Sequence, residues 1–312
     1  MNAAPALLAY AAGVGLVGPR VLLRSAWPHR APALGAAVWT ALMLSFTLAV
    51  ALVTAQLAMP SGHLHTGLFG LLHACGLDRL ADPGTLGALT TPLDGVAAPP
   101  LAAVVAPFAV LGGLAGAFLF RLARAGRLRA RHRDRLDKVG VRSARLGATV
   151  LPHRTAAAWC LPGLRSRVVV SDAAVRLLTD EQLDAVLEHE RAHVAGRHHL
   201  PLALADAFAT VFPRLPLARH ARAELAVLLE MVADDRSLRS HPYEVVATAM
   251  YEMAAARAPK GAFAVGGPTA LLRMRRVLGP RRSPHPALRG SLVSFALAAP
   301  LLPLLVACPP GL

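Results

Sequence analysis

Long apolar runs alternate with polar, arginine-rich stretches along this chain. Four stretches contain no charged residue: 1–19, 31–62, 95–120 and 290–312. Each holds a segment close to the roughly 20 apolar residues that a helix needs to cross a bilayer, and the most hydrophobic are Ala37–Met59 and Leu101–Phe120. Pro300 and Pro303 interrupt the last one, which neighbouring helices can accommodate. The pattern therefore predicts four transmembrane helices.

The composition agrees with a membrane protein. Of the 312 residues, 55% are hydrophobic and 16% are charged, and the mean hydropathy is +0.48. A soluble domain has about 45–50% apolar and about 25% charged residues, so the composition excludes a wholly soluble protein. It also excludes an intrinsically disordered one. Three cysteines are too few for a disulfide framework.

The net charge of +15 is concentrated in the loops. The first loop carries Arg20, Arg24 and Arg30, whereas the second loop, of about 40 residues, has only Arg79. Ten cations follow the third predicted helix: Arg121, Arg124, Arg127, Arg129, Arg131, Arg133, Arg135, Lys138, Arg142 and Arg145. By the positive-inside rule this side is cytoplasmic. The expected partner of the run is anionic lipid, because no aromatic residue interleaves the arginines and direct nucleic-acid binding is not expected.

This topology predicts a multi-pass protein of the cell membrane whose chain divides into three parts. Residues 1–121 are expected to hold three transmembrane helices with a short cytoplasmic loop and a longer outer loop. Residues 122–288 are expected to form a cytoplasmic domain, and 289–312 a C-terminal transmembrane helix. The outer loop is the only sizeable candidate for receiving an external signal.

The cytoplasmic block has its own pattern of strands and helices. Residues 155–171 predict two short strands about a Pro162–Gly163 turn. Thr179 and Gln182 follow the capping-box spacing and predict a helix that runs to about Gly196. A second helix is predicted over Arg222–Leu238. Between them, Leu200–Leu217 is either a fifth, membrane-dipping segment or core packing, and the interrupting prolines and Asp206 favour core packing.

The capped helix carries the chemistry, because it contains the pattern H-E-x-x-H at His189, Glu190 and His193. Histidines four residues apart lie one helical turn apart, so both imidazoles can bind one metal ion. A zinc ion in such a site makes a coordinated water acidic near neutral pH. Glu190 is placed to accept that proton. We therefore expect one zinc ion per chain, with Glu190 as the general base.

A catalytic zinc site usually has a third protein ligand. The second helix offers Glu230 and, one turn later, Asp234, which can hydrogen-bond a ligand imidazole from behind. Glu224 is the rival ligand, although its neighbours do not repeat the acid pair. A surface pair of acids with no metal is the plainer alternative for Glu230 and Asp234. The leucines around Glu230 favour a buried acid, which needs a partner.

Other polar residues receive weaker interpretations. Arg236, His241 and Tyr243 are three candidates for stabilising the oxyanion of the reaction, with nothing to choose among them. Three further histidines are interpreted as surface or packing residues: His198, His199 and His220. His63 and His65 in the outer loop are weak evidence for a metal site, and the three cysteines are taken as free thiols: Cys75, Cys160 and Cys308.

With transmembrane helices, a cytoplasmic H-E-x-x-H and a downstream E-x-x-x-D, the sequence resembles the BlaR/MecR-type membrane metallopeptidases of the gluzincin clan. The motif-level resemblance covers about 145–240. It implies a mainly α fold, with multi-pass helices and a zincin-like α+β peptidase domain made of a short strand pair and the H-E-x-x-H helix. It implies that His189, His193 and Glu230 bind zinc, that Glu190 is the general base and that Asp234 supports a ligand.

The resemblance also implies what the enzyme acts on. The strand before the active-site helix would hold an extended substrate peptide by edge pairing. Relatives cleave, or trigger the loss of, a cytoplasmic DNA-binding repressor, so the expected partner is a protein substrate, possibly such a repressor. Because the chain ends soon after its last predicted helix, no penicillin-binding sensor domain and no direct β-lactam sensing are expected.

Two other functions remain open at this point. HtpX-like proteases share both motifs and degrade damaged membrane proteins, although the arrangement of the four segments fits the first family better. A non-catalytic membrane scaffold that binds a repressor would use zinc only structurally. Glu190 argues against the scaffold, because a structural zinc site has no use for a general base.

Overall fold

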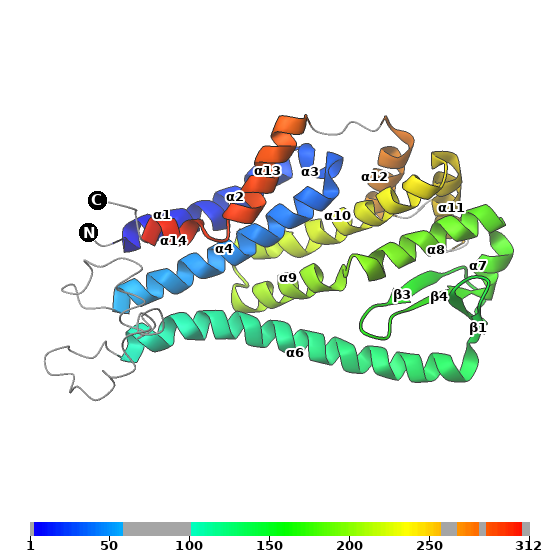
Figure 1. Ribbon diagram of the computed structural model, residues 1–312, viewed down its shortest axis with the longest axis horizontal. Coiled ribbons are helices and arrows are strands. Elements are labelled where there is room, and N and C mark those ends of the chain that lie inside the picture. Colours follow the sequence, from blue (N-terminus) through cyan, green and yellow to red (C-terminus); the bar gives the residue numbers. More distant parts are fainter. Residues whose placement is uncertain (1–2, 59–100, 257–266, 281–284, 308–312) are drawn as a thin grey trace, which may run out of the picture.

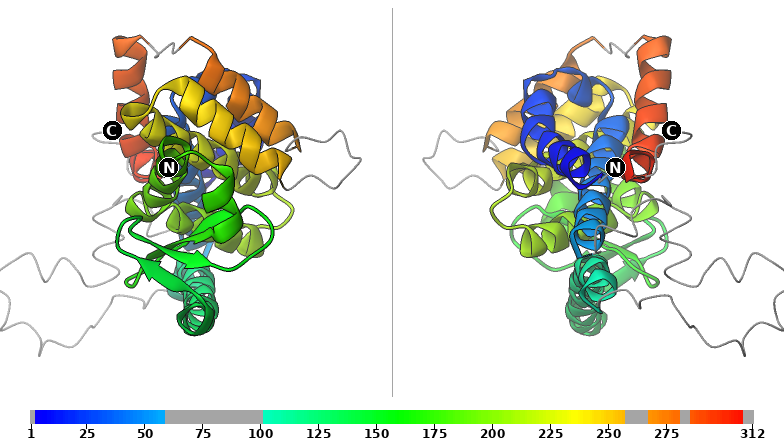
Figure 2. Two further views of the ribbon diagram at one scale, coloured as in Figure 1. Left: turned by 90° about the vertical axis from the view of Figure 1, so that its right-hand side faces the viewer. Right: turned by 90° about the vertical axis from the view of Figure 1, so that its left-hand side faces the viewer.

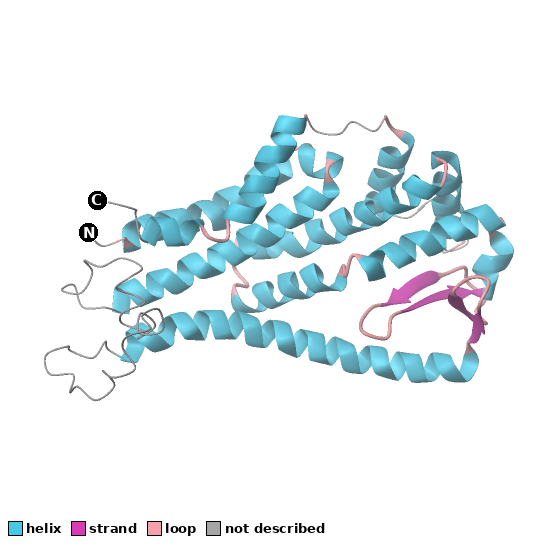
Figure 3. Cartoon of the chain, viewed as in Figure 1, coloured by secondary structure: helices cyan, strands magenta, loops and turns pink. Residues whose placement is uncertain are grey.

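The computed structural model describes residues 3–58, 101–256, 267–280 and 285–307 (Figure 1). Four residues of the predicted outer loop and C-terminus lie outside the described residues: His63, His65, Cys75 and Cys308. The described chain is mainly helical, with a small sheet at the end of the molecule opposite both termini (Figure 3). This arrangement confirms the predicted fold class.

Within the described residues, three helices are long and apolar enough to cross a membrane: Ala4–Arg24, Pro32–Ala58 and Val105–Val139. The first consists of α1 (Ala4–Ala12), a π-helical segment η1 (Gly13–Val17) and α2 (Gly18–Arg24). A short helix α3 (Trp27–Arg30) leads into α4 (Pro32–Ala58). These helices match the first two predicted transmembrane segments and support the prediction of a membrane protein.

The third predicted segment, Leu101–Phe120, is only the first half of α6 (Leu101–Val139). The helix continues through the arginine run, because residues 121–139 are mostly arginine, alanine and leucine, which favour helix. It ends at Gly140, which lies so close to Thr149 that an added Cβ would be 2.6 Å from its Cγ2. The predicted domain boundary at residue 122 therefore lies inside a helix.

The remaining helices are α7 (Asp172–Leu177), α8 (Asp180–Ala195), α9 (His199–Val211), α10 (Pro216–Ser240), α11 (Tyr243–Ala255), α12 (Gly267–Leu278), α13 (Pro286–Ala298) and α14 (Leu302–Ala307). The last predicted transmembrane helix is thus two shorter helices. The break lies at Pro300, which has no amide hydrogen to donate to a helical carbonyl. The predicted boundary at 288/289 lies inside α13.

Helix α4 is the centre of the helical bundle. It contacts α1, α6, α9, α10, α13 and α14, and 72% of its apolar window is buried inside the protein. α4 is hydrophobic on every side, and such a helix needs apolar surroundings on every side. These neighbouring helices supply them. The bundle core joins α4 to α9 and α10, with Trp39, Phe208 and Leu228 among its most buried residues.

The sheet has four strands, in the order β1 (Val141–Ser143), β2 (Ala148–Leu151), β4 (Arg167–Ser171) and β3 (Ala158–Leu161). β3 and β4 pair antiparallel about the predicted Pro162–Gly163 turn, which confirms the strand pair. β2 pairs parallel to β4, and β1 antiparallel to β2. The sequence did not predict β1 and β2, because strands of 3 and 4 residues are too short to show alternation.

Local chemistry sets the ends of α8 as the sequence predicts. The Thr179 side chain accepts from the Gln182 amide, and the Gln182 side chain accepts from the Thr179 amide, at 3.3 and 3.1 Å. These bonds satisfy two of the free amides at the helix start. The helix ends at Ala195 with Gly196 as its C-cap. The second predicted helix, Arg222–Leu238, lies inside the longer α10, which begins at Pro216.

The segment Leu200–Leu217 belongs to the core. It forms most of α9 and the turn into α10, and Ala205, Ala207 and Phe208 are fully buried. The Phe46 ring of α4 meets the rings of Phe208 and Phe212 edge-on at 5.9 and 5.1 Å. The core-packing alternative is therefore the one that the structure supports.

Candidate metal centre

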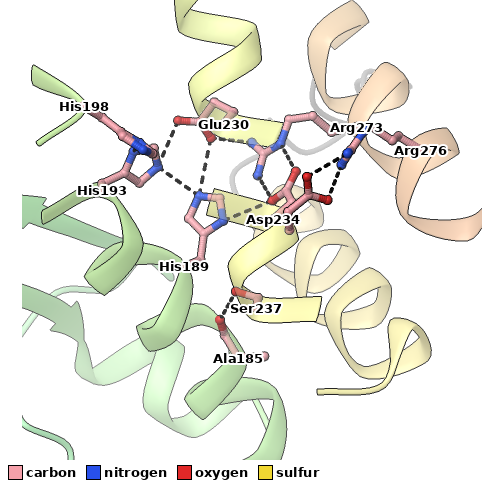
Figure 4. A network of polar contacts seen from close by, with 10 residues as sticks. Ala185, His189, His193, His198, Glu230, Asp234, Ser237, Arg273 and Arg276 are labelled. Carbon is pink, nitrogen blue, oxygen red and sulfur yellow. Dashed lines mark hydrogen bonds and ion pairs between the residues drawn. The ribbon is translucent and has the colours of Figure 1, made fainter. Parts of the chain in front are cut away.

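α8 and α10 lie side by side and pair their residues at one-turn intervals (Figure 4). At one end the buried Ser237 hydroxyl donates to the Ala185 carbonyl at 2.9 Å. One turn along, His189 Nδ1 lies 3.0 Å from Asp234 Oδ1. One turn further, His193 Nε2 lies 3.2 Å from Glu230 Oε1. The packing of two helices thus brings the predicted site residues together.

The three predicted ligands converge on one point. His189 Nε2 lies 3.1 Å from His193 Nε2 and 3.5 Å from Glu230 Oε2, and one donor atom from each residue lies within 4.8 Å of the others. Tetrahedral zinc with bonds of about 2.0–2.1 Å requires donors about 3.3 Å apart. Two imidazole nitrogens and one carboxylate oxygen are also donors that zinc prefers. The residues present fit one zinc ion.

Each imidazole is held from behind through its Nδ1 atom, which leaves Nε2 facing the shared point. Asp234, whose side chain is only 2% exposed, holds His189. His198, which is buried, holds His193 with 2.7 Å between the two Nδ1 atoms. Such partners fix the orientation of a metal-binding ring. Asp234 takes the predicted supporting role, whereas His198 had been interpreted only as a surface or packing residue.

Gly196 makes room for His198. An added Cβ at Gly196 would lie 2.5 Å from His198 Nε2, a distance that a side chain cannot occupy. Burial, helped by the charge of His193, lowers the pKa of His198 to about 4. The ring is therefore neutral near pH 7, and one of its nitrogens can accept a hydrogen bond from His193. The tight turn after α8 thus helps to orient the second ligand.

Arg273 of α12 holds the acids of α10 in place. Its guanidinium donates two hydrogen bonds to Asp234, at 2.7 and 2.8 Å, and one to Glu230 Oε2 at 2.6 Å. One turn along, Arg276 binds both oxygens of Asp235 at 2.7 and 2.8 Å and donates to the His29 carbonyl. Sequence reasoning missed Arg273. The available signal was the group of three acids Glu230, Asp234 and Asp235 on α10, because buried acids need a cation nearby.

The donors strongly affect one another's protonation. Burial works against a charged His189, but the hydrogen bonds that its ring donates to Asp234 and Glu230 outweigh it and raise the pKa of His189 to about 9. Burial likewise opposes ionisation of Glu230, yet His189, His193 and the charge of Arg273 hold the pKa of Glu230 well below its ordinary value. The pKa of Asp234 is lowered for similar reasons, against its burial. The centre therefore favours a positive charge between its donors.

Glu190 lies on the side of the centre that faces the sheet. Burial first, and then the neighbouring Glu190 carboxylate, raises the pKa of the Cys160 thiol in β3 to about 12. Cys160 is a free thiol, as predicted. β3 is an edge of the sheet and runs beside α8. The predicted base thus lies between the ligand cluster and an edge strand.

Several other sequence candidates lie away from the centre. Arg236 donates to Glu188 at 2.8 Å, and His241 lies 3.4 Å from Asp184. Tyr243 is 50% exposed at the start of α11. Glu224 is absent from the candidate metal cluster found among the described residues. None of the three oxyanion candidates is in the network around the ligands, and the structure favours Glu230 over Glu224 as the third ligand.

Residues 122–227 match the model of Peptidase family M48. The match covers about a third of the chain, including α8 with its H-E-x-x-H motif, and ends just before Glu230. It supports a membrane-type M48 metallopeptidase. Zinc dependence is typical of that family, whereas the narrower BlaR/MecR assignment stays a prediction. The comparisons with curated proteins and with solved structures gave no match.

We expect zinc binding to release about one proton below pH 9. The metal-free His189 is protonated below its pKa of about 9, and zinc needs the neutral ring. Affinity should therefore rise with pH and level off above about 9. Since the pKa of His189 in the folded protein lies above the ordinary histidine value of 6.5, the proton stabilises the metal-free fold below pH 6.5. That stability is lost as the pH rises through about 9.

Calorimetric titration of zinc at pH 7, in two buffers of different ionisation enthalpy, measures the released proton. Asp234→Asn is the control, because it removes the carboxylate that favours the His189 proton. Zinc binding without proton release by the original protein would contradict the assignment of His189.

Arg273→Ala should weaken zinc binding about 10-fold or more, by loosening Glu230 and Asp234. It should also destabilise the protein by about 3–5 kcal/mol, because the buried Asp234 loses its cation. Arg273→Lys should be intermediate, since lysine keeps the charge but not the two-pronged geometry. Competition with a chromogenic chelator measures the affinity. Arg275→Ala, an exposed neighbour on α12, is the control. Tighter zinc binding by Arg273→Ala would show that charge repulsion outweighs positioning.

Proposed function

We propose that the protein is a zinc-dependent endopeptidase that hydrolyses peptide bonds of a protein substrate. The observation that carries this proposal is the convergence of His189, His193 and Glu230 beside a separate carboxylate, Glu190. A purely structural zinc site closes its fourth position with another protein ligand. Among the described residues the candidate cluster has three ligands, which suits catalysis better than the scaffold alternative.

The substrate peptide is proposed to bind in extended form along β3. This strand pairs with β4 on one side only among the described residues. Its other edge has unpaired backbone groups, which can form a ladder with a peptide. The contact between Cys160 and Glu190 places this strand next to the base. Backbone pairing would hold peptides of varied sequence in one register.

The roles of the chain's own residues follow from their positions. A bound zinc ion supplies an electrophile that polarises the peptide carbonyl and makes water more acidic. Glu190 accepts the proton of the attacking water and passes it to the leaving amine. His189, His193 and Glu230 hold the metal. Asp234, His198 and Arg273 keep those three side chains in the orientation that the reaction requires.

The biological role that we propose is signalling through cleavage of a cytoplasmic transcriptional repressor. An HtpX-like role in the quality control of membrane proteins is the alternative. The resemblance to BlaR/MecR-type peptidases supports the first, and the match to family M48 supports peptidase chemistry without separating the two. The two roles differ in selectivity, because a quality-control enzyme accepts many unfolded chains.

Glu190→Gln should abolish proteolysis and leave zinc binding intact, because glutamine keeps the shape of the side chain but cannot take a proton. The measurement is cleavage of unfolded casein by the detergent-purified protein with zinc present. Broad cleavage that depends on Glu190 would favour quality control. Bound zinc with no casein cleavage would favour a dedicated substrate such as a repressor. Equal cleavage by both forms would contradict the role of Glu190.

We further propose that the metal centre faces the cytoplasm. The ten cations within 121–145 support this orientation through the positive-inside rule. A reporter fused at about residue 140 should therefore be active as a cytoplasmic fusion. A matched fusion at Arg30 should report the same side, because the first loop is also basic. An external signal from the fusion at 140 would invert the topology.

A further inference from the structure

The turn between α9 and α10 lies deep among the apolar segments. Phe208 and Phe212, at the end of α9, pack against Phe46 of α4. Phe46 lies nine residues inside the apolar run that starts at Ala37. At 1.5 Å per residue this is about 13 Å along the helix axis, close to the middle of a hydrocarbon layer about 30 Å thick.

A second pair of helices gives a similar depth. Leu215, in the turn itself, lies so close to Gly15 that an added Cβ there would be 2.9 Å from Leu215 Cδ1. Gly15 precedes Arg20, the first cation of the chain, by five residues, or about 7.5 Å along the axis. The turn between α9 and α10 therefore lies roughly 7–13 Å inside the boundary of the apolar segments.

Two arginines occupy this region: Arg214 in the turn and Arg219 in the first turn of α10. We call them the cation ladder. Both side chains are exposed, and no carboxylate among the described residues forms an ion pair with them. Their neighbours differ in this respect, since Arg222 pairs with Asp206 at 3.1 Å and Arg121 donates to Thr210 at 2.7 Å.

The two arginines of the cation ladder lie on the surface of the helical bundle and not in its core. α9 packs against α6 and α10 against α4, whereas α13 lies at the edge of the molecule (Figure 2). An exposed cation at this depth is expensive in hydrocarbon and needs water or an anion beside it. Since the protein supplies no acid among the described residues, the counter-charge has to come from the surroundings.

We propose that the cation ladder is a binding site for the phosphate headgroups of anionic phospholipids, drawn inward from the nearer leaflet. Guanidinium groups bind phosphate oxygens in pairs, and basic clusters next to membrane helices attract anionic lipids. Headgroups held there thin the bilayer beside α9 and α10. α9, of 13 residues, connects this region to α8, the helix that carries His193.

The first test measures lipid retention by the full chain. Protein is reconstituted in vesicles of phosphatidylcholine with a minor share of phosphatidylglycerol, and the bound phosphatidylglycerol is counted by mass spectrometry. Arg214→Gln with Arg219→Gln should weaken the preference for phosphatidylglycerol about 30-fold, at about 1 kcal/mol per arginine. Arg154→Gln with Arg165→Gln, two exposed arginines in the loops of the sheet region and outside the basic run of α6, should leave it unchanged. An equal loss in both variants would overturn the proposal in favour of general surface charge.

The second test measures depth and water access by thiol labelling with a charged, membrane-impermeant reagent. The background lacks Cys75, Cys160 and Cys308. The two controls on α6 are Leu128→Cys in the basic run and Leu119→Cys in the apolar run, where the leucines are 47% and 63% exposed. Pro213→Cys, beside the intact ladder, should label about as fast as Leu128→Cys and far faster than Leu119→Cys. Adding the two arginine substitutions should slow the labelling of Pro213→Cys.

Two results of the second test would overturn the proposal. Labelling of Pro213→Cys as slow as that of Leu119→Cys would show that hydrocarbon covers the turn. Disulfide-linked dimers of Pro213→Cys would identify a second copy of the chain as the occupant. Zinc content, measured on every variant, reports folding independently of lipid, because the ladder does not contact the metal centre.

Discussion

The antiparallel register of α8 against α10 is the constraint on which the metal centre depends. Ser237 with Ala185, Asp234 with His189, and Glu230 with His193 are three successive rungs between the same two helices. Each residue along a helix adds a rotation of about 100°. A slip of one residue would therefore separate all three rungs together. The buried bond from the Ser237 hydroxyl to the Ala185 carbonyl, which involves no catalytic group, secures the register at one end.

The same two helices tie the centre to the membrane. α10 reaches from the apolar core of α4 to the ligand Glu230, and α9 continues α8 into that core. α12 adds a third connection, because Arg273 binds the acids of α10 while Arg276 reaches the His29 carbonyl in α3. The site is therefore held by elements from both halves of the chain.

The features that the sequence predicts correctly are those whose residues lie close together along the chain. The capping box, the H-E-x-x-H motif and the E-x-x-x-D pair are each contained within one helix, and the structure brings His189, His193, Glu230 and Asp234 together as predicted. Arg273 and His198 were missed because their roles arise from packing. Arg273 meets Asp234 across 39 residues of sequence, and His198 is buried only because the chain turns sharply at Gly196. β1 and β2 also escaped prediction, because they are too short to show alternation. The full length of α6 was missed because a change from apolar to basic composition does not end a helix.

The segment that matches the peptidase family, 122–227, shares part of its core with the N-terminal helices. Leu217 and Leu225 on α10 are fully buried, and the cluster that covers them includes Trp39, Met43 and Phe46 of α4. Without the N-terminal helices, this segment would expose those leucines to water as an apolar patch that favours aggregation. The matched segment therefore depends on the N-terminal helices for burial of part of its apolar surface, and α10 joins that shared interior to the candidate metal centre.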